Sequence, residues 1–417
     1  MIFVAALAIR FLFLWLYLDS HPVRALSTIP FLFEPGNIAY SLVNGNGFAS
    51  PFRVETGPTA WMTPVWPLIL AGVFKLFGTY TIQAFVAAAG LNVCFSAVTC
   101  IPVYAAARRI AGSGAAAGAT WLWAVFPTAI LLPYESLWDA SLSALLATTL
   151  LWATMVVSES VSNSRWAAYG LLWGFGLMTN AALLSLLLFL FGWAEFRSHR
   201  MGKYDFRNPL LAAAMAMLCC MPWMVRNYRV FHAFVPLRSV AGLALWLGNN
   251  EHGDGLSARQ HPISYQQERD RYVELGEIAY MREKQAEAVS YMLGHPARTV
   301  QLAALRFTAI WTGTSGRFLD DVRRARTARF YLVVGSDLVA ALGALLGVIL
   351  LARGRDPRLI PLAAFPLVFP LVYYFALAPP RYRHPIDPAL LILTVLAFTR
   401  LAHLKKRPVQ GRTSNPS

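Results

Sequence analysis

Long apolar segments separated by short polar ones recur along the whole chain. Ten of them carry few charged residues over lengths close to the 17 to 25 residues, roughly, with which a helix crosses a bilayer. They lie at 2–18, 81–107, 114–132, 140–157, 166–178, 180–195, 209–225, 327–352, 359–378 and 386–402. Backbone groups in hydrocarbon must bind one another, so each segment is expected to be helical. The pattern predicts an all-α, polytopic membrane protein with about ten transmembrane helices.

One further apolar run, 61–78, has a different pattern. It contains two early prolines, Pro64 and Pro67, then Lys75, and it ends at Gly78. These features favour a helix that lies in the membrane interface or re-enters it over one that spans the bilayer. Counting it as a span would also reverse the side of every later loop.

The basic residues support this topology of ten spans. With the N-terminus inside, the inner connections contain Arg108 and Arg109, Arg165, the stretch 195–207, the stretch 353–358 and a basic cytoplasmic tail at 403–417. Cytoplasmic loops of membrane proteins carry such an excess of lysine and arginine. The outer segments are then 19–80, 133–139, 226–326 and 379–384. We therefore expect one transmembrane domain over 1–402, with a structured first outer loop at 19–80 and a longer outer loop at 226–326.

Composition agrees with the membrane assignment. The 417 residues are 57% hydrophobic and 14% charged, whereas about a quarter of a soluble domain is charged. The formal net charge is +15. In a soluble protein that excess would suggest nucleic acid, but here it sits in short loops where it sets orientation and meets anionic lipid. No nucleic-acid motif is present, and we expect no nucleic-acid partner.

Three acidic residues lie in the expected outer segments near the membrane. Glu34 occurs in FLFEPGNIAYSL, and Glu135 and Asp139 occur in PYESLWDAS. Glu135 and Asp139 are four residues apart, so on a helix they would share one face. An acid in such a water-poor setting is a functional candidate. The alternatives are a helix cap for Glu135 and Asp139 and an ordinary turn acid for Glu34.

Arginines gather at the same side of the predicted membrane. Arg226 ends a span in PWMVRNYRVF, and Arg381, Arg383 and His384 fill the short connection PPRYRHPID. The planar guanidinium group can hold a phosphate through two hydrogen bonds, which suits an anionic lipid headgroup. The alternative is that these arginines only snorkel to the interface.

The order of several segments resembles a known family. GNGFASPF, TGPTAWMTPVWPLILAGVFKLFG, PWMVRNYRVF, LALWLGNN and PRYRHPIDP follow the acid of the first outer loop in sequence. In this order they resemble bacterial glycosyltransferases of the GT-C superfamily. The resemblance is to the RgtA/B/C/D-like group, which is related to protein O-mannosyltransferases and the lipid-A aminoarabinose transferase. It covers about residues 1–402.

The resemblance implies an activity and a location. The implied reaction is an inverting transfer of a sugar from a polyprenyl-phosphate-linked donor to an acceptor. It would take place at the outer face of a bacterial plasma membrane, with both termini cytoplasmic. The acceptor stays open between protein, lipid A, a cell-wall glycan and another lipid.

The resemblance also implies residue roles. Glu34 stands where the family has its catalytic base, more often an aspartate. Arg226 matches a cationic position at the outer end of its span, and Arg381 and Arg383 are further candidates for the donor phosphate. Glu135 and Asp139 match the region of a second acidic motif.

No cofactor is expected from the sequence. A loose set of Glu34, Glu135, Asp139 and His384 could in principle bind a divalent metal ion. Their spacing carries no metal-binding pattern, and the expectation is that the protein requires no metal.

Two other functions compete with glycosyl transfer. A transporter or flippase of lipids or glycolipids would show paired halves, broken spans and ionisable groups at mid-membrane depth. Here no paired halves are visible, and apart from Arg10 the ionisable residues are expected in loops or near span ends. A membrane scaffold would not account for acids, arginines and aromatic residues gathered in the outer loops.

Overall fold

The computed structural model describes residues 1–251, 253, 256, 258–314, 318–324, 327–354, 357 and 360–405. Within these residues the chain is almost entirely helical, and the β pairing consists of the isolated bridge between Ala49 and Pro58. The helices of the expected spans are α1 (Ile2–Ser20), α5 (Ile82–Val98), α6 (Cys100–Val125), α7 (Pro127–Glu135), α8 (Ala140–Val157), α9 (Asn163–Thr179), η2 (Ala181–Leu183), α10 (Leu184–Arg200), α11 (Arg207–Phe231), α17 (Ala328–Gly354), α18 (Ile360–Val368), α19 (Leu371–Phe375) and α20 (Asp387–Lys405).

These helices confirm an all-α, multi-pass membrane protein. Among the described residues, seven helical segments are long and apolar enough to cross a bilayer. One of them, Ile82–Val125, contains two expected spans, because the backbone kinks at Gly112 with φ 83° and ψ −177°. Only glycine adopts that conformation without strain. The spans predicted at 166–178 and 359–378 correspond to α9 and to the pair α18 and α19, which are shorter helices.

The run 61–78 forms a helix that is too short to cross. α4 (Val65–Phe77) has 13 residues, about 20 Å at 1.5 Å per residue, against a hydrocarbon core of about 30 Å. Trp66, Leu70 and Phe74 are buried at a spacing of four, so one face of α4 packs on the protein. This helix therefore stays outside the set of spans, as predicted.

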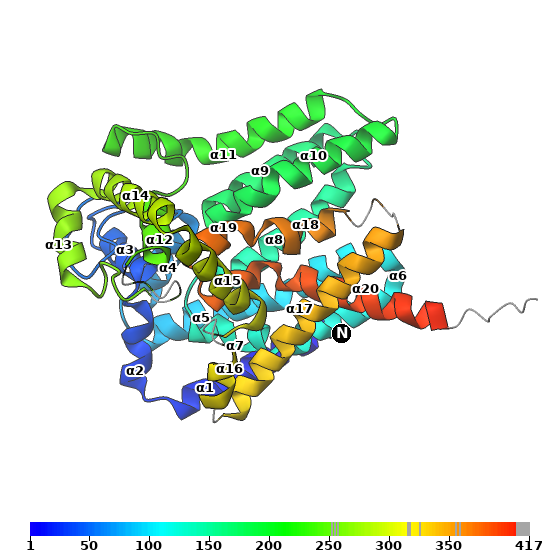
Figure 1. Ribbon diagram of the computed structural model, residues 1–417, viewed down its shortest axis with the longest axis horizontal. Helices are drawn as coiled ribbons and strands as arrows, with labels where there is room; N and C mark the ends of the chain where they lie inside the picture. The colour runs from blue at the N-terminus through cyan, green and yellow to red at the C-terminus, as the bar shows by residue number, and fades with distance from the viewer. Residues whose placement is uncertain are drawn as a thin grey trace, which may run out of the picture.

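The remaining helices belong to the expected outer loops. They are α2 (Val23–Ser27), η1 (Ile29–Phe31), α3 (Glu34–Val43), α12 (Ala241–Gly248), α13 (Gln266–Leu275), α14 (Glu277–Gly294), α15 (Pro296–Thr312), α16 (Phe318–Arg324) and η4 (Pro380–Ile386). Figure 1 shows α2, α3, α12, α13 and α14 gathered at one end of the bundle, named here the loop-rich end. The α10–α11 connection and the end of α20 lie at the opposite end. Both long expected outer loops therefore lie on one side.

In the long outer loop, Gly276, at φ 76°, separates the consecutive helices α13 and α14. The predicted start of the C-terminal tail needs adjustment. α20 continues to Lys405, so the first residues of the predicted tail are helical. The rest of that tail, 406–417, lies outside the described residues.

Arg10, the charged residue of the first span, stabilises a helix break. It is fully buried and donates to the carbonyls of Trp123 (2.9 Å) and Ala124 (3.0 Å), at the end of α6. It also donates to the carbonyl of Ala129 (3.2 Å) in α7 and to the Ser96 hydroxyl (2.9 Å) in α5. Carbonyls at a helix end have no partner within the helix, so this guanidinium replaces the water that lipid cannot supply.

Candidate active site

The first turn of α3 buries Glu34 at the loop-rich end. Glu34 is 5% exposed and begins the helix directly after Phe33, whose extended backbone has ψ 172°. Pro35 follows in the first turn, where no amide hydrogen is needed. Position 36 has room only for glycine, because a Cβ there would stand 2.0 Å from the carbonyl oxygen of Phe31. The sequence FEPG thus starts a helix tightly against η1 with an acid in its first turn.

The buried carboxylate of Glu34 is paired with a histidine from the long outer loop. His261 Nε2 lies 3.1 Å from Glu34 Oε1. The Nδ1 atom of the same ring accepts a hydrogen bond from the backbone amide of Ile263 (3.2 Å), so the ring proton belongs on Nε2. Burial lowers the pKa of His261, against the opposing charge of Glu34. The pair is therefore best described as a neutral imidazole donating to a carboxylate.

An aromatic cage surrounds this pair. The ring of His261 lies 5.3 Å from that of Trp61 and 6.3 Å from that of Phe52, both edge-on. Tyr272 of α13 packs edge-on against Phe52 at 5.1 Å. Phe52 and Trp61 come from the first outer loop, whereas His261 and Tyr272 come from the long one. The cage excludes water from one side of Glu34 and joins the two loops.

A second buried acid fastens the same two loops. Glu277 at the start of α14 accepts hydrogen bonds from the Thr59 hydroxyl (2.5 Å), the Ala60 amide (2.7 Å) and the Tyr272 hydroxyl (2.6 Å). Burial, followed by the nearby Glu277 charge, raises the pKa of Tyr272 well above its ordinary value. Tyr272 therefore stays protonated and donates. Glu277 was not predicted as a site residue, because nothing in its local sequence, GEIAYMREKQ, marks it as a buried acid.

Arg226 supports the first outer loop from the membrane side. Its guanidinium donates to the carbonyls of Phe48 (2.7 Å) and Thr59 (2.7 Å) and to the side chain of Asn227 (3.0 Å). It also lies over the ring of Trp223 at 5.1 Å. α11 runs past this residue to Phe231, so Arg226 does not end its helix as expected. Two of these three hydrogen bonds hold protein backbone.

The acids Glu135 and Asp139 do not share a helix face, in contrast to the expectation. Glu135 is the last residue of α7, and Asp139 directly precedes α8, because the chain turns between them. Glu135 forms an ion pair with Arg329 of α17, and burial raises its pKa despite that partner. The geometry places the two acids in different surroundings.

Asp139 lies among cations that come from distant parts of the chain. It accepts a hydrogen bond from the Ser143 hydroxyl at 2.8 Å. Burial raises the pKa of Asp139, and the positive charges of Arg238 and Arg381 oppose that rise. Asp139 is thus an acid of the loop-rich end with two arginines nearby, of which Arg238 was not selected from the sequence.

Arg381 lies over an aromatic ring next to the Glu34 region. Its guanidinium carbon is 4.7 Å from the ring centre of Trp138, and its buried Nε has no hydrogen-bond partner among the described residues. The Trp138 ring in turn lies 6.5 Å from that of Phe33, the residue before Glu34. A chain of contacts therefore connects the buried acid of α3 with an arginine that has donors to spare.

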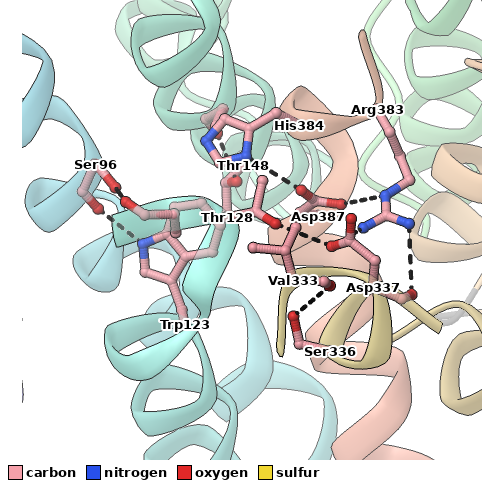
Figure 2. A network of polar contacts seen from close by, with 12 residues as sticks. Ser96, Trp123, Thr128, Thr148, Val333, Ser336, Asp337, Arg383, His384 and Asp387 are labelled. Atoms are coloured by element: carbon pink, nitrogen blue, oxygen red, sulfur yellow. Dashed lines mark hydrogen bonds and ion pairs between the residues drawn. The ribbon is translucent and has the colours of Figure 1, made fainter. Parts of the chain in front are cut away.

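Arg383, in contrast to Arg381, is surrounded by hydrogen-bond partners (Figure 2). Its Nη2 lies 2.5 Å from Asp337 Oδ1 and its Nε donates to Asp387 Oδ1 at 2.7 Å. Its Nη1 donates to the carbonyls of Ile310 and Trp311, each at 3.3 Å. All three nitrogens of this buried guanidinium are bound by protein. Asp337 also shows that an ionisable residue other than Arg10 is buried inside a span, which the sequence analysis missed.

His384 extends the same network. Its Nδ1 lies 3.1 Å from Asp387 Oδ2, and its ring stacks on Trp123 at 5.5 Å (Figure 2). The Nε2 atom is buried and lacks a hydrogen-bond partner within the described chain. Arg383 and His384 thus anchor η4 to α17 and α20, and η4 carries Arg381 two residues before the anchor.

The structure does not bring the proposed metal-binding set together. Glu34 pairs with His261, Glu135 with Arg329 and His384 with Asp387. Among the described residues, no three His, Cys, Asp or Glu side chains are placed to hold a metal ion. That no metal is required stays a prediction.

Comparison with known proteins gives structural matches only. Neither the models of known protein families nor the curated protein sequences match this chain. The fold is similar to the oligosaccharyltransferase AglB of Archaeoglobus fulgidus, solved with an inhibitory peptide and a dolichol-phosphate. The TM-score is 0.59 at 16% identity, over 100% of this chain and 52% of that one. For the apo form of the Archaeoglobus fulgidus oligosaccharyltransferase the TM-score is 0.57 at 16% identity, over 97% and 50%.

A third similar structure is ArnT of Cupriavidus metallidurans bound to undecaprenyl phosphate. Its TM-score is 0.44 at 13% identity, over 96% of this chain and 77% of that one. Both proteins are glycosyltransferases of the GT-C superfamily. The chain spans about half the length of the oligosaccharyltransferase. This protein therefore shares the fold of the matched part of the oligosaccharyltransferase, in agreement with the sequence resemblance to the GT-C superfamily, while the narrower RgtA/B/C/D-like grouping stays a prediction.

Proposed function

We propose that this protein is an inverting glycosyltransferase, which moves a sugar from a polyprenyl-phosphate-linked donor to an acceptor. The fold is that of enzymes whose solved structures hold dolichol-phosphate or undecaprenyl phosphate. The observation that carries the proposal is the buried carboxylate of Glu34 paired with neutral His261 at the loop-rich end.

Glu34 serves as the general base in this proposal. An acceptor hydroxyl must lose its proton as it attacks the anomeric carbon, and a positioned carboxylate takes that proton. The imidazole N–H fixes Oε1, and no described residue binds Oε2, which is left to face the acceptor. The acceptor oxygen forms its bond to carbon as the bond from carbon to the phosphate oxygen breaks, so the configuration inverts.

Arg381 and Arg238 are the proposed partners of the leaving lipid phosphate. The leaving oxygen becomes more negative during transfer, and preorganised cations stabilise that charge. The buried Nε of Arg381 has no hydrogen-bond partner among the described residues, and both arginines act on the charge of Asp139. Asp139 would orient the two guanidinium groups between turnovers. Arg226 and Arg383, the other candidates from the sequence, already bind protein groups and are proposed to hold the site in shape.

The loop-rich end is proposed to face outward from the plasma membrane, with both termini cytoplasmic. The basic connections at the other end support this orientation. A cysteine placed at Ser50, on the first outer loop, should react in intact cells with a membrane-impermeant thiol reagent. Labelling that requires inside-out vesicles would reverse the orientation.

The activity is tested with purified protein in liposomes, a radiolabelled polyprenyl-phosphate sugar and a cell-envelope extract as acceptor source. Glu34→Gln keeps an oxygen that accepts the His261 hydrogen bond but removes the base, so transfer should fall about 10²- to 10⁴-fold. Glu274→Gln is the matched control, because its side chain is 68% exposed and pairs only with Arg271. Wild-type rates in Glu34→Gln would remove the base assignment. Transbilayer movement of the lipid without any transfer by wild-type protein would favour the flippase.

A further inference from the structure

The face of α3 that begins with Glu34 continues along a surface cleft. Asn37 and Ser41 follow Glu34 at spacings of three and four, so the three side chains share one helix face. Asn37 and Ser41 line a cleft of about 300 Å³. That volume corresponds to about ten water molecules, which suits a small polar ligand such as a sugar unit. Phe52 lines the cleft and also belongs to the cage around His261.

The opposite wall of the cleft is a hairpin of the first outer loop, residues 48–59. Ser50 donates its amide to the carbonyl of Gly57 (2.9 Å), and Thr59 donates its amide to the carbonyl of Phe48 (3.1 Å). The base of this hairpin is the part that Arg226 and Glu277 bind from two sides. The wall is therefore held in place before any ligand arrives, which lowers the cost of ordering on binding.

An aromatic face and uncharged polar groups dominate the lining. The rings of Tyr40 and Tyr80 stack at 5.6 Å with an angle of 14° between their planes. Tyr40 is 45% exposed, so part of this stack faces solvent. Asn37 and Ser41 are buried and donate to the carbonyls of Pro51 and Gly47, each at 3.0 Å, so they offer the cleft what is left of an amide and a hydroxyl group, and Asn46 adds a further amide. Aromatic rings offer an apolar platform to the C–H face of a sugar, while amides and hydroxyls bind its hydroxyl groups.

The charges at the rim cancel. Arg53 and Glu55 of the hairpin line the cleft, and neither forms an ion pair with a described residue. One cation and one anion give the cleft no net charge. It thus differs from the surroundings of Asp139, where the positive charges of Arg238 and Arg381 favour a phosphate.

The geometry points to this cleft as the acceptor subsite, and to a neutral, hydroxyl-rich glycan as the acceptor. The inference rests on the proposed glycosyl transfer with Glu34 as base. A glycan lying along α3 would place a hydroxyl group toward the first turn of the helix. Peptides and phospholipid headgroups are the rejected alternatives.

Binding is tested without any need for catalysis. In Asn46→Cys, an impermeant maleimide labels the rim, while the four native cysteines lie in the apolar helices α5, α6 and α11. Neutral oligosaccharides released from the cell envelope should slow labelling at least about fivefold. Equal masses of envelope peptides, or phosphatidylglycerol vesicles, should have no effect. Protection by peptides or vesicles, or none by oligosaccharides, overturns the inference.

Measurements of the acceptor KM and of donor hydrolysis then test the acceptor subsite separately from the proposed glycosyl transfer. Tyr40→Ala removes the exposed ring and should raise the KM for the envelope acceptor up to about tenfold. Hydrolysis of the donor by water, measured in the same variant, should fall less than transfer to the acceptor, because the donor phosphate is bound elsewhere. An unchanged acceptor KM, or equal loss of hydrolysis, contradicts the subsite. If wild-type protein neither hydrolyses nor transfers the sugar, the proposed function fails, whereas the labelling result still decides the cleft.

Discussion

Arg381 and Arg383 stand two residues apart on η4, yet their surroundings differ. Arg383 is buried, with its three nitrogens bound by two carboxylates and three carbonyls. Arg381 stacks on Trp138 and keeps a buried donor without a partner among the described residues. The difference teaches that an arginine near the membrane surface is free for a ligand only where the fold has not used its donors.

Arg10 and Arg306 resemble Arg383, because protein groups bind their guanidinium groups as well. Arg10 binds the carbonyls at the break between α6 and α7. Arg306 of α15 donates to the carbonyl of Tyr374 (2.7 Å) and to the side chain of Asn249 (2.9 Å), near the ends of α19 and α12. These guanidinium groups satisfy backbone that helix breaks leave unpaired in a setting with little water.

The largest effect is expected from removing the anchor. Arg383→Ala would leave Asp337 and Asp387 buried without their cation, and breaking a buried pair in this way costs about 3–5 kcal/mol. Thermal unfolding in detergent should show a large loss of stability and of folded yield. A melting temperature like that of wild type would mean that Arg383 is not an anchor, and the comparison with Arg381 would break down.

A smaller and more selective effect is expected at Arg381. Arg381→Ala removes charged hydrogen bonds worth about 1.5–3 kcal/mol, so kcat/KM for the lipid donor should fall about 10- to 100-fold. Because no described carbonyl or carboxylate is hydrogen-bonded to this side chain, the melting temperature should fall much less than in Arg383→Ala. Arg298→Ala, on the exposed side of α15, is the matched control. Loss of stability with unchanged donor kinetics would mean that Arg381 stabilises the fold, as Arg383 does, and does not bind the donor.

The smallest effect is expected from the titration of His261. Burial lowers the pKa of this histidine, so the folded protein resists protonation while the unfolded chain takes a proton below its ordinary value of 6.5. The contribution of the neutral pair with Glu34 is complete above pH 6.5 and is lost as the pH falls toward the lowered value. His261→Gln keeps an N–H donor and should flatten this part of the stability profile, measured by unfolding between pH 4 and 8. An identical slope in both proteins would contradict the neutral pair.

Much of the fold could be predicted from the sequence, because membrane spans follow from local composition. Helices cover all ten apolar segments, and the short α4 stays outside that set. Glu34 could also be selected, since an acid in a mostly apolar outer segment beside the membrane is unusual. His261 could not, because its neighbours in the long loop have no motif and its meeting with Glu34 depends on how two loops pack.

The chain by itself determined the helical class, the order of the spans and the types of side chain that gather at one end. It could do so because hydrocarbon forces every apolar stretch of sufficient length to pair its own backbone. Only the tertiary structure decided which polar groups remain free. Glu135 pairs with Arg329, 194 residues away, and Arg226 binds the carbonyl of Phe48, 178 residues away. Arg383 is bound by Asp337 and Asp387, whereas the Nε of Arg381 has no hydrogen-bond partner among the described residues. These partners depend on packing that no local pattern contains.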